Sequence, residues 1–173
     1  MIVDMTYNGQ SVNWPGKGTF KATSGMPGFQ RPASACVPDG GPVPEGLYKV
    51  FLSDQGTAAD DGSGTCALKP AWGMQTIPRG VAAAGCEPYW ANWGKNRARM
   101  EPADTATRVR CVPVMRGGFY LHDSTKGFSH GCIEVETRIF PLMRAHRKTT
   151  GKDALVIKVA YVKDRTTNGG TKA

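Results

Sequence analysis

Apolar and polar residues alternate over several short stretches of the chain, a pattern typical of β-strands with one buried face. Residues 5–14 form a predicted hairpin around Asn8-Gly9, a dipeptide that accepts the positive φ angles of a tight turn. Residues 19–23 alternate in the same way, and residues 47–52 form the clearest strand of the first half. The pattern therefore predicts short strands and turns over residues 1–54.

Regular patterning returns after residue 107. The predicted elements are strands over 109–115, 118–122 and 154–162 and a helix over 137–148. Ile139, Phe140 and Met143 recur at helical spacing, and Pro141 requires the helix to start or kink nearby. The last strand is a β-branched run suited to a buried position.

Residues 55–100 interrupt this pattern. A polar, flexible stretch is followed by two cysteines and by Trp72, Trp90 and Trp93. We interpret it as a loop-rich insertion, with its aromatic residues used in packing or in lining a ligand groove. The surrounding residues 1–163 are predicted to form a single domain, and the polar residues 164–173 a flexible tail.

Composition supports a loop-rich, mainly β domain. The 173 residues suit one domain, and 22 Gly with 12 Pro disfavour long helices. No apolar run approaches the roughly 20 residues that a membrane span needs, so none is expected. The net charge of +8 would attract polyanions, such as nucleic acid, anionic lipid or an acidic cell-wall polymer. The basic residues are scattered without a recognition motif, so nucleic acid is not an expected partner.

The chain has five cysteines, an unusual number for a cytosolic domain. No CxxC pair is present, which disfavours a zinc ribbon. The odd count is typical of four structural cysteines and one reactive thiol, with three possible pairings, of which Cys66–Cys86 within the insertion is one. The N-terminal residues lack the features of a secretory signal, so we expect an oxidising destination reached by an unusual route.

Residues 117–134, GGFYLHDSTKGFSHGCIE, hold the most informative chemistry. A cysteine attacks carbonyl carbon as its thiolate and needs a neighbouring base. His122 ends a predicted strand, and the loop that follows can return to bring Cys132 to the imidazole. Asp123 or a backbone carbonyl could then fix the imidazole tautomer. The N–H of Gly131 or of Cys132 could stabilise an oxyanion.

This segment resembles the signature of the L,D-transpeptidase catalytic domain: a strand-end His122, then Ser129-His130-Gly131-Cys132 and an apolar residue. Pro44-Glu45-Gly46-Leu47-Tyr48 is similar to the Pro-x-Gly-x-Tyr segment of that family. The resemblance implies an L,D-transpeptidase-like β-sandwich with one short helix after the nucleophile turn.

The resemblance also implies the chemistry. Cys132 would be the nucleophile and His122 the general base, while His130 and Ser129 would shape the turn and Gly131 would lie in the oxyanion region. The substrate would be the peptidoglycan stem peptide, cleaved between meso-diaminopimelate and D-Ala by hydrolysis or by exchange with a D-amino acid. No metal or cofactor is implied. Arg116 is our candidate for binding a substrate carboxylate.

Two differences separate the chain from the housekeeping enzymes of this family. The His122–Ser129 gap is shorter, and Glu134 stands where they commonly have Arg or Asn. The short gap and the opening TYNGQ…KATSGMPG resemble the type VI secretion L,D-transpeptidase effectors. That implies an antibacterial toxin that is made in the cytoplasm without a signal peptide, exported by the secretion apparatus and active in a target cell's periplasm. A cognate immunity protein is then expected in the producing cell.

Three alternatives remain open at this point. A papain-like amidase would ordinarily have its cysteine before its histidine, the reverse of the order here. A zinc-dependent peptidase could use His122, His130 and Cys132, whose residue types suit zinc although their spacing matches no common pattern. A non-catalytic module could bind the cell wall through its basic surface and the Trp-rich insertion.

Overall fold

The computed structural model describes residues 1–173 and shows a mainly β protein, as predicted. The strands are β1 (Met5–Tyr7), β2 (Ser11–Trp14), β3 (Gly18–Ser24), β4 (Gly46–Phe51), β5 (Asp54–Thr57), β6 (Met74–Thr76), β7 (Asn96–Pro102), β8 (Phe119–His122), β9 (Ile133–Val135) and β10 (Ala154–Val159). The helices are α1 (Glu87–Trp90), α2 (Thr105–Arg108) and α3 (Ile139–Thr150), with 3-10 segments η1 (Pro32–Ser34), η2 (Gly80–Ala83) and η3 (Ala91–Trp93).

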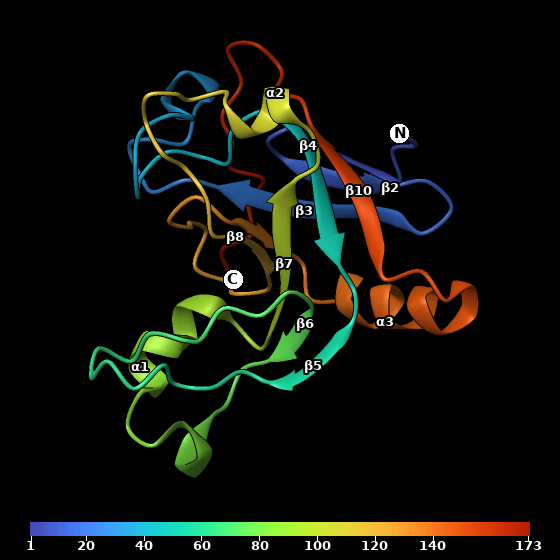
Figure 1. The fold of residues 1–173 in the computed structure, drawn as a ribbon. Helices are drawn as coiled ribbons and strands as arrows, with labels where there is room; N and C mark the ends of the chain where they lie inside the picture. Colours follow the sequence, from blue (N-terminus) through green and yellow to red (C-terminus); the bar gives the residue numbers. More distant parts are fainter.

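Eight of these strands close into a barrel. Hydrogen-bonded neighbours follow the order β4-β10-β1-β2-β3-β9-β8-β7, and β7 also pairs with β4 to complete the ring. In Figure 1, β4, β7 and β10 run along one side, and β2 and β3 cross them at a steep angle. The strands therefore form one closed sheet rather than the two separate layers of the expected sandwich.

Strand β7 is what closes the ring. It pairs along its length with β8, at its start with β6 and at its end with β4. Residues 96–102 thus belong to the barrel, whereas residues up to 100 were predicted from the sequence to belong to the insertion. Its alternation is masked because Arg97 and Arg99 are long and charged, although Arg97 is only 1% exposed.

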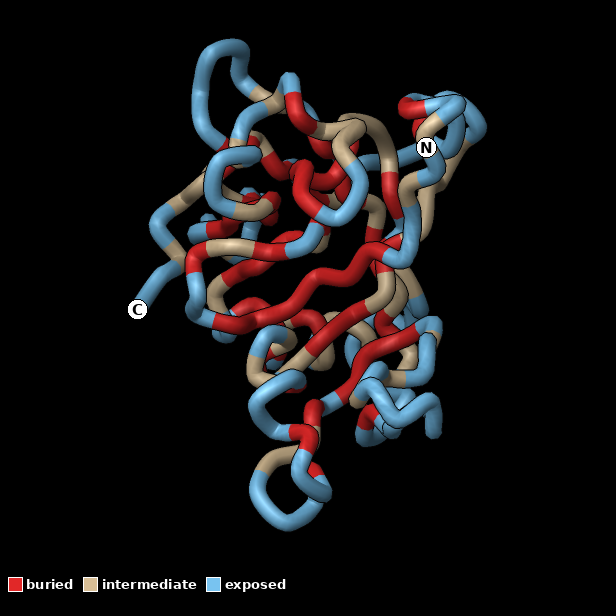
Figure 2. Tube along the Cα trace, turned by 90° about the vertical axis from the view of Figure 1, so that its left-hand side faces the viewer, coloured by how far each residue is buried: buried red, intermediate tan, exposed pale blue.

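Alternate side chains of the strands fill the barrel. Met5 and Tyr7 of β1 and Leu155 and Ile157 of β10 are fully buried and belong to one cluster of 23 core residues. Successive residues of a strand point to opposite faces, so this alternation is what a closed sheet requires. Figure 2 shows buried segments through the middle of the molecule and exposed loops around them.

The helix predicted over 137–148 is α3, which begins two residues later. Pro141 lies in its first turn, where a missing N–H costs nothing. Ile139, Phe140 and Met143 are fully buried in the core cluster. Gly151 ends the helix in a left-handed conformation, and its N–H donates to Arg147 O at 2.8 Å. No helix in the protein has the length and apolar character needed to cross a bilayer.

The insertion projects from one end of the barrel, at the bottom of Figure 1. It has its own small core of Ala58, Ile77, Ala83, Cys86 and Trp90. Strands β5 and β6 join it to β7. The disulfide between Cys66 and Cys86 confirms the pairing suggested within this segment, and Trp90 Nε1 donates to Cys66 O at 2.6 Å.

The strand predicted over 109–115 is wrong. The short helix α2, capped by the Asp104 side chain, ends at Arg108, and residues 109–113 form a series of turns. Val112 and Met115 are largely exposed, so the apolar residues of this stretch are not one face of a sheet. Pro113 lacks the N–H that a central strand would use. The Cys36–Cys111 disulfide ties the segment to the loop after β3.

The residues after 164 pack against the barrel rather than forming the expected flexible tail. Thr167 is fully buried, its hydroxyl donates to Ser24 O at 2.6 Å, and its carbonyl accepts from the Ser24 N–H at 2.9 Å. Gly169 allows this close approach, because a Cβ there would lie 2.0 Å from Gln10 O and 2.3 Å from Ala22 O. The polar composition of the segment concealed these hydrogen bonds.

Candidate active site

Parallel pairing of β8 and β9 brings the two predicted catalytic side chains together. His122 ends β8 and pairs with Glu134 in β9, so Cys132, just before β9, lies opposite Tyr120, two residues before His122 in β8. The Tyr120 N–H lies 3.3 Å from Cys132 Sγ and donates to it. The connection between the two side chains therefore returns on itself, as the sequence predicted.

His122 and Cys132 line one cavity of about 170 Å³. Its other lining residues come from the insertion and from the loop before Cys132: Tyr89, Asn92, Trp93, Phe128, Ser129 and His130. Cys132 is half-buried and is the free cysteine of the chain, since the other four form the two disulfides. The prediction of four structural cysteines and one free thiol is confirmed.

Ser129 holds the turn that carries Cys132. Its hydroxyl oxygen accepts from the N–H groups of Gly25 at 3.1 Å and Gly131 at 3.4 Å, and its hydroxyl donates to Cys132 O. Ser24 Oγ donates to the same carbonyl at 2.7 Å. The Cys132 N–H itself has no acceptor in the protein. The Gly131 N–H is thus engaged within the turn, whereas the Cys132 N–H is free to bind a substrate oxygen.

Arg116 lies directly behind this turn. Gly131 has a φ of +118°, and a Cβ added to it would lie 2.2 Å from Arg116 Nη2. The guanidinium donates to the carbonyls of Ala35, Pro42 and Gly41, the last two at 3.1 and 3.2 Å. We expected Arg116 to bind a substrate carboxylate, but its hydrogen bonds go to backbone carbonyls, so the contacts present it as a support of the turn.

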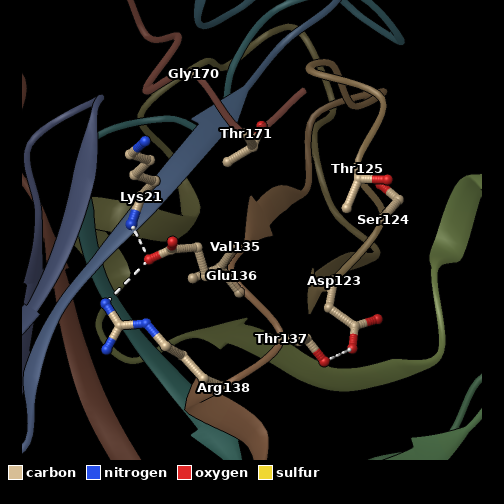
Figure 3. Close-up of a pocket in the computed structure, with 10 residues that line it drawn as sticks. All are labelled: Lys21, Asp123, Ser124, Thr125, Val135, Glu136, Thr137, Arg138, Gly170 and Thr171. Carbon is tan, nitrogen blue, oxygen red and sulfur yellow. Dashed lines mark hydrogen bonds and ion pairs between the residues drawn. The ribbon is translucent and has the colours of Figure 1, made fainter. Parts of the chain in front are cut away.

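Ser124, rather than Asp123, contacts the His122 ring. Ser124 Oγ lies 3.3 Å from Nδ1. The Asp123 carboxylate accepts from the backbone and side-chain N–H groups of Asn96, both at 2.8 Å, and from the Thr137 hydroxyl at 2.7 Å, a contact visible in Figure 3. Asp123 therefore joins β8 to β7, and the expected contact between Asp123 and the imidazole is corrected. No sequence pattern singled out Ser124.

Burial controls the ionisation of the two reactive groups. It raises the pKa of the Cys132 thiol to about 11, against the opposing charges of Arg97 and Arg116. It lowers the pKa of His122 to about 4, against the opposing charge of Asp123. Near pH 7 the resting site therefore holds a neutral thiol and a neutral imidazole rather than a thiolate–imidazolium pair.

Arg97 is a buried cation near the thiol that sequence reasoning missed. Its Nε donates to Gln75 Oε1 at 2.9 Å and its Nη2 to Lys69 O at 2.7 Å. The guanidinium carbon lies 4.2 Å from the centre of the Tyr120 ring and 4.7 Å from that of Trp93. These contacts compensate the burial of a charge without an acidic partner.

Trp93 links this stack to the imidazole. Its ring meets the His122 ring edge-to-face, with centroids 5.6 Å apart, and meets Tyr120 at 5.0 Å. The sequence left open whether the tryptophans of the insertion pack or line a groove. Trp90 packs in the insertion's core, while Trp93 lines the cavity.

His130 stands at the edge of the cavity. It is exposed, and its Nδ1 lies 3.4 Å from Asp39 O. His122, His130 and Cys132 do not gather into a group with the geometry of metal ligands, and no other set of His, Cys, Asp or Glu does so. The arrangement therefore does not fit the zinc-peptidase alternative.

Neither the models of known protein families nor the sequences of characterised proteins match this chain.

Proposed function

We propose that the chain is a cysteine acyl-transfer enzyme of the L,D-transpeptidase type, acting on peptidoglycan stem peptides between meso-diaminopimelate and D-Ala. One observation carries the proposal: of five cysteines, only Cys132 is free, and it shares a cavity with His122. The SHGC motif at the same turn supplies the substrate class. A thiol, a base and an unengaged backbone N–H at one cavity are what acyl transfer requires.

In the acylation step, His122 acts as general base. Because both groups rest neutral, the proton passes from Cys132 Sγ to His122 Nε2 as sulfur attacks the diaminopimelate carbonyl carbon. The carbonyl oxygen becomes an oxyanion, which the Cys132 N–H can bind. The imidazolium then gives its proton to the amine of D-Ala as the C–N bond breaks, leaving a thioester.

In the second step, water or the amine of a D-amino acid attacks the thioester. His122 takes a proton from the attacking group and returns one to sulfur as the C–S bond breaks. Water completes a carboxypeptidase cycle, and an amine completes an exchange. Arg97 and Arg116 lower the thiol pKa and therefore also favour the developing thiolate when it leaves.

The biological setting is part of the same proposal. Two disulfides suit an oxidising compartment such as the periplasm, and the net charge of +8 suits an anionic wall. Together with the resemblance at residues 122–133, these features support an antibacterial effector delivered by a type VI apparatus and neutralised in its producer by an immunity protein.

Release of D-Ala from purified stem tetrapeptide tests the proposal. Cys132→Ala and His122→Ala should abolish release while the folded structure persists, whereas His146→Gln, a change at the histidine on α3, should leave it unchanged. Release that persists in either of the first two variants would contradict the assignment. Binding of the unaltered protein to cell walls without any release would favour a non-catalytic binding module.

A further inference from the structure

Glu134 is fully buried in β9 although it carries a carboxylate. Burying such a group is costly unless its oxygens are hydrogen-bonded. Oε1 accepts from the Gly127 N–H at 2.8 Å and from the Thr171 hydroxyl, and Oε2 accepts from the Lys126 N–H at 3.2 Å and from the Ser124 hydroxyl. No lysine or arginine pairs with it, so its negative charge remains uncancelled beside the site.

The Ser124 hydroxyl lies between this carboxylate and the imidazole. It has a single hydrogen, which it donates to Glu134, and its oxygen lies 3.3 Å from His122 Nδ1. The oxygen must therefore accept a hydrogen bond from an Nδ1–H. In that tautomer, Nε2 carries the lone pair, which is the form that a general base for Cys132 requires.

We propose that Ser124 and Glu134 are positioning residues that hold His122 as the Nδ1–H tautomer and stabilise its protonated form during acyl transfer. This inference rests on the proposed function. When Sγ gives its proton to Nε2, the imidazolium keeps its Nδ1–H bond to Ser124, and the Glu134 carboxylate stabilises the new positive charge through the hydroxyl. Neither residue forms or breaks a covalent bond.

The C-terminal segment completes this arrangement. Thr171 supplies one of the four donors to Glu134, and the Ala173 N–H donates to Thr125 O at 3.1 Å, on the loop after β8. Figure 3 shows Thr171 and Ser124 on opposite sides of a polar cavity of about 290 Å³. Glu134 is therefore fully buried with the Thr171 hydroxyl bonded to its Oε1.

Kinetics of matched variants test the proposal. Ser124→Ala and Glu134→Gln should each lower kcat by about 100-fold with KM unchanged, because the imidazolium loses its stabilisation. In Glu134→Gln, the acidic limb of the pH–rate profile should also move to lower pH, because an imidazole without the nearby negative charge binds its proton more weakly. Thr171→Val should lower kcat by a smaller factor, because it removes one of the four hydrogen bonds to Glu134.

Glu136→Gln is the matched control. Glu136 lies two positions further along the chain and bonds the Lys21 N–H and Arg138, facing away from Ser124 (Figure 3). Its substitution should leave kcat and the pH profile unchanged. Thermal unfolding of each variant separates a catalytic effect from a loss of folded protein.

The tautomer of His122 can be measured by NMR, without an activity assay. Long-range ¹H–¹⁵N spectra of the full chain, labelled at histidine, should show His122 protonated on Nδ1 and unprotonated on Nε2. Ser124→Ala should shift the proton toward Nε2. A proton on Nε2 in the unaltered protein, or unchanged kcat in both folded variants, would overturn the proposal. The expected tautomer with no release of D-Ala would instead refute the proposed function and support the positioning of the ring.

Discussion

Gly131 has a conformation and a position that tolerate no side chain. Its φ of +118° is strained for other residues, and a Cβ would collide with Arg116. Gly131→Ala should therefore displace either the Cys132 turn or the guanidinium and lower kcat/KM by about 100-fold. The measurement is steady-state release of D-Ala.

Gly117→Ala provides the comparison. A Cβ at Gly117 meets nothing within 4 Å, and the residue lies in the same chain segment. Its activity should match that of the unaltered protein. Equal activity in Gly131→Ala and Gly117→Ala would show that the close contact between the turn and Arg116 has no catalytic role.

The Cys132 thiol should behave as a weak acid in the resting protein. Because burial raises its pKa to about 11, the thiolate fraction grows about tenfold per pH unit throughout the neutral and mildly alkaline range. The rate of alkylation by iodoacetamide should therefore rise about tenfold per pH unit from pH 7 to pH 10, whereas for a free cysteine, with a pKa of about 8.5, the rise slackens above pH 8.5 and levels off near pH 10.

A plateau of the alkylation rate already at pH 7 would contradict this picture. It would indicate a preformed thiolate paired with a protonated His122, and the proton transfer that precedes attack would then be unnecessary. The matched reference is the same protein after denaturation, in which Cys132 is the thiol exposed.

Among the elements, η3 is the part of the insertion whose Trp93 contacts His122, the proposed general base. Trp93 fixes one edge of the His122 ring and covers the Arg97 guanidinium. Trp93→Ala should lower kcat/KM by about tenfold, since an aromatic pair contributes about 1 kcal/mol and the ring gains freedom when the pair is lost. Trp72→Ala, at a half-exposed ring stacked on Arg99, should have little effect.

Elements with simple apolar patterns were predictable and those with charged or special residues were not. β1 lies in the predicted hairpin, and β4 and β10 are short runs rich in apolar and β-branched residues, so their positions followed from the sequence. β7 was missed because Arg97 is buried by stacking on the Trp93 and Tyr120 rings, and the pattern of apolar and polar residues does not show such contacts. The stretch 109–115 is rich in apolar and β-branched residues without being a strand, since a disulfide rather than a sheet holds it.

The sequence predicted the site residues whose type is set by acyl-transfer chemistry. It did not predict the residues that act only through their position in the fold. Cys132 and His122 followed from a thiol and a base near each other in the chain. Ser124 and Glu134 could not be assigned, because their contact depends on the pairing of β8 with β9. A charged residue between Ile133 and Val135 was the available signal for Glu134.

At the scale of the whole molecule, the two disulfides connect parts of the site that are far apart in sequence. Cys36–Cys111 joins the segment before Arg116 to the loop that supplies the Ala35 carbonyl, and Cys66–Cys86 closes the insertion that carries Trp93. Protein folded under oxidising conditions and then denatured should show one free thiol per chain in a colorimetric titration.

Reduction should raise that number to five thiols and destabilise the fold by several kcal/mol, of which the shorter loop contributes about 3 kcal/mol. Denaturant unfolding of the oxidised and reduced protein measures the difference. More than one thiol in the oxidised protein would contradict the disulfide arrangement described above.

Intact-mass spectrometry after incubation with stem tetrapeptide tests the central claim most directly. An acyl adduct equal to the stem peptide without D-Ala, trapped in acid and mapped to the peptide containing Cys132, is the predicted result. The adduct should be absent from Cys132→Ala and should disappear when a D-amino acid is added. An unmodified Cys132 in protein that still releases D-Ala would contradict the account.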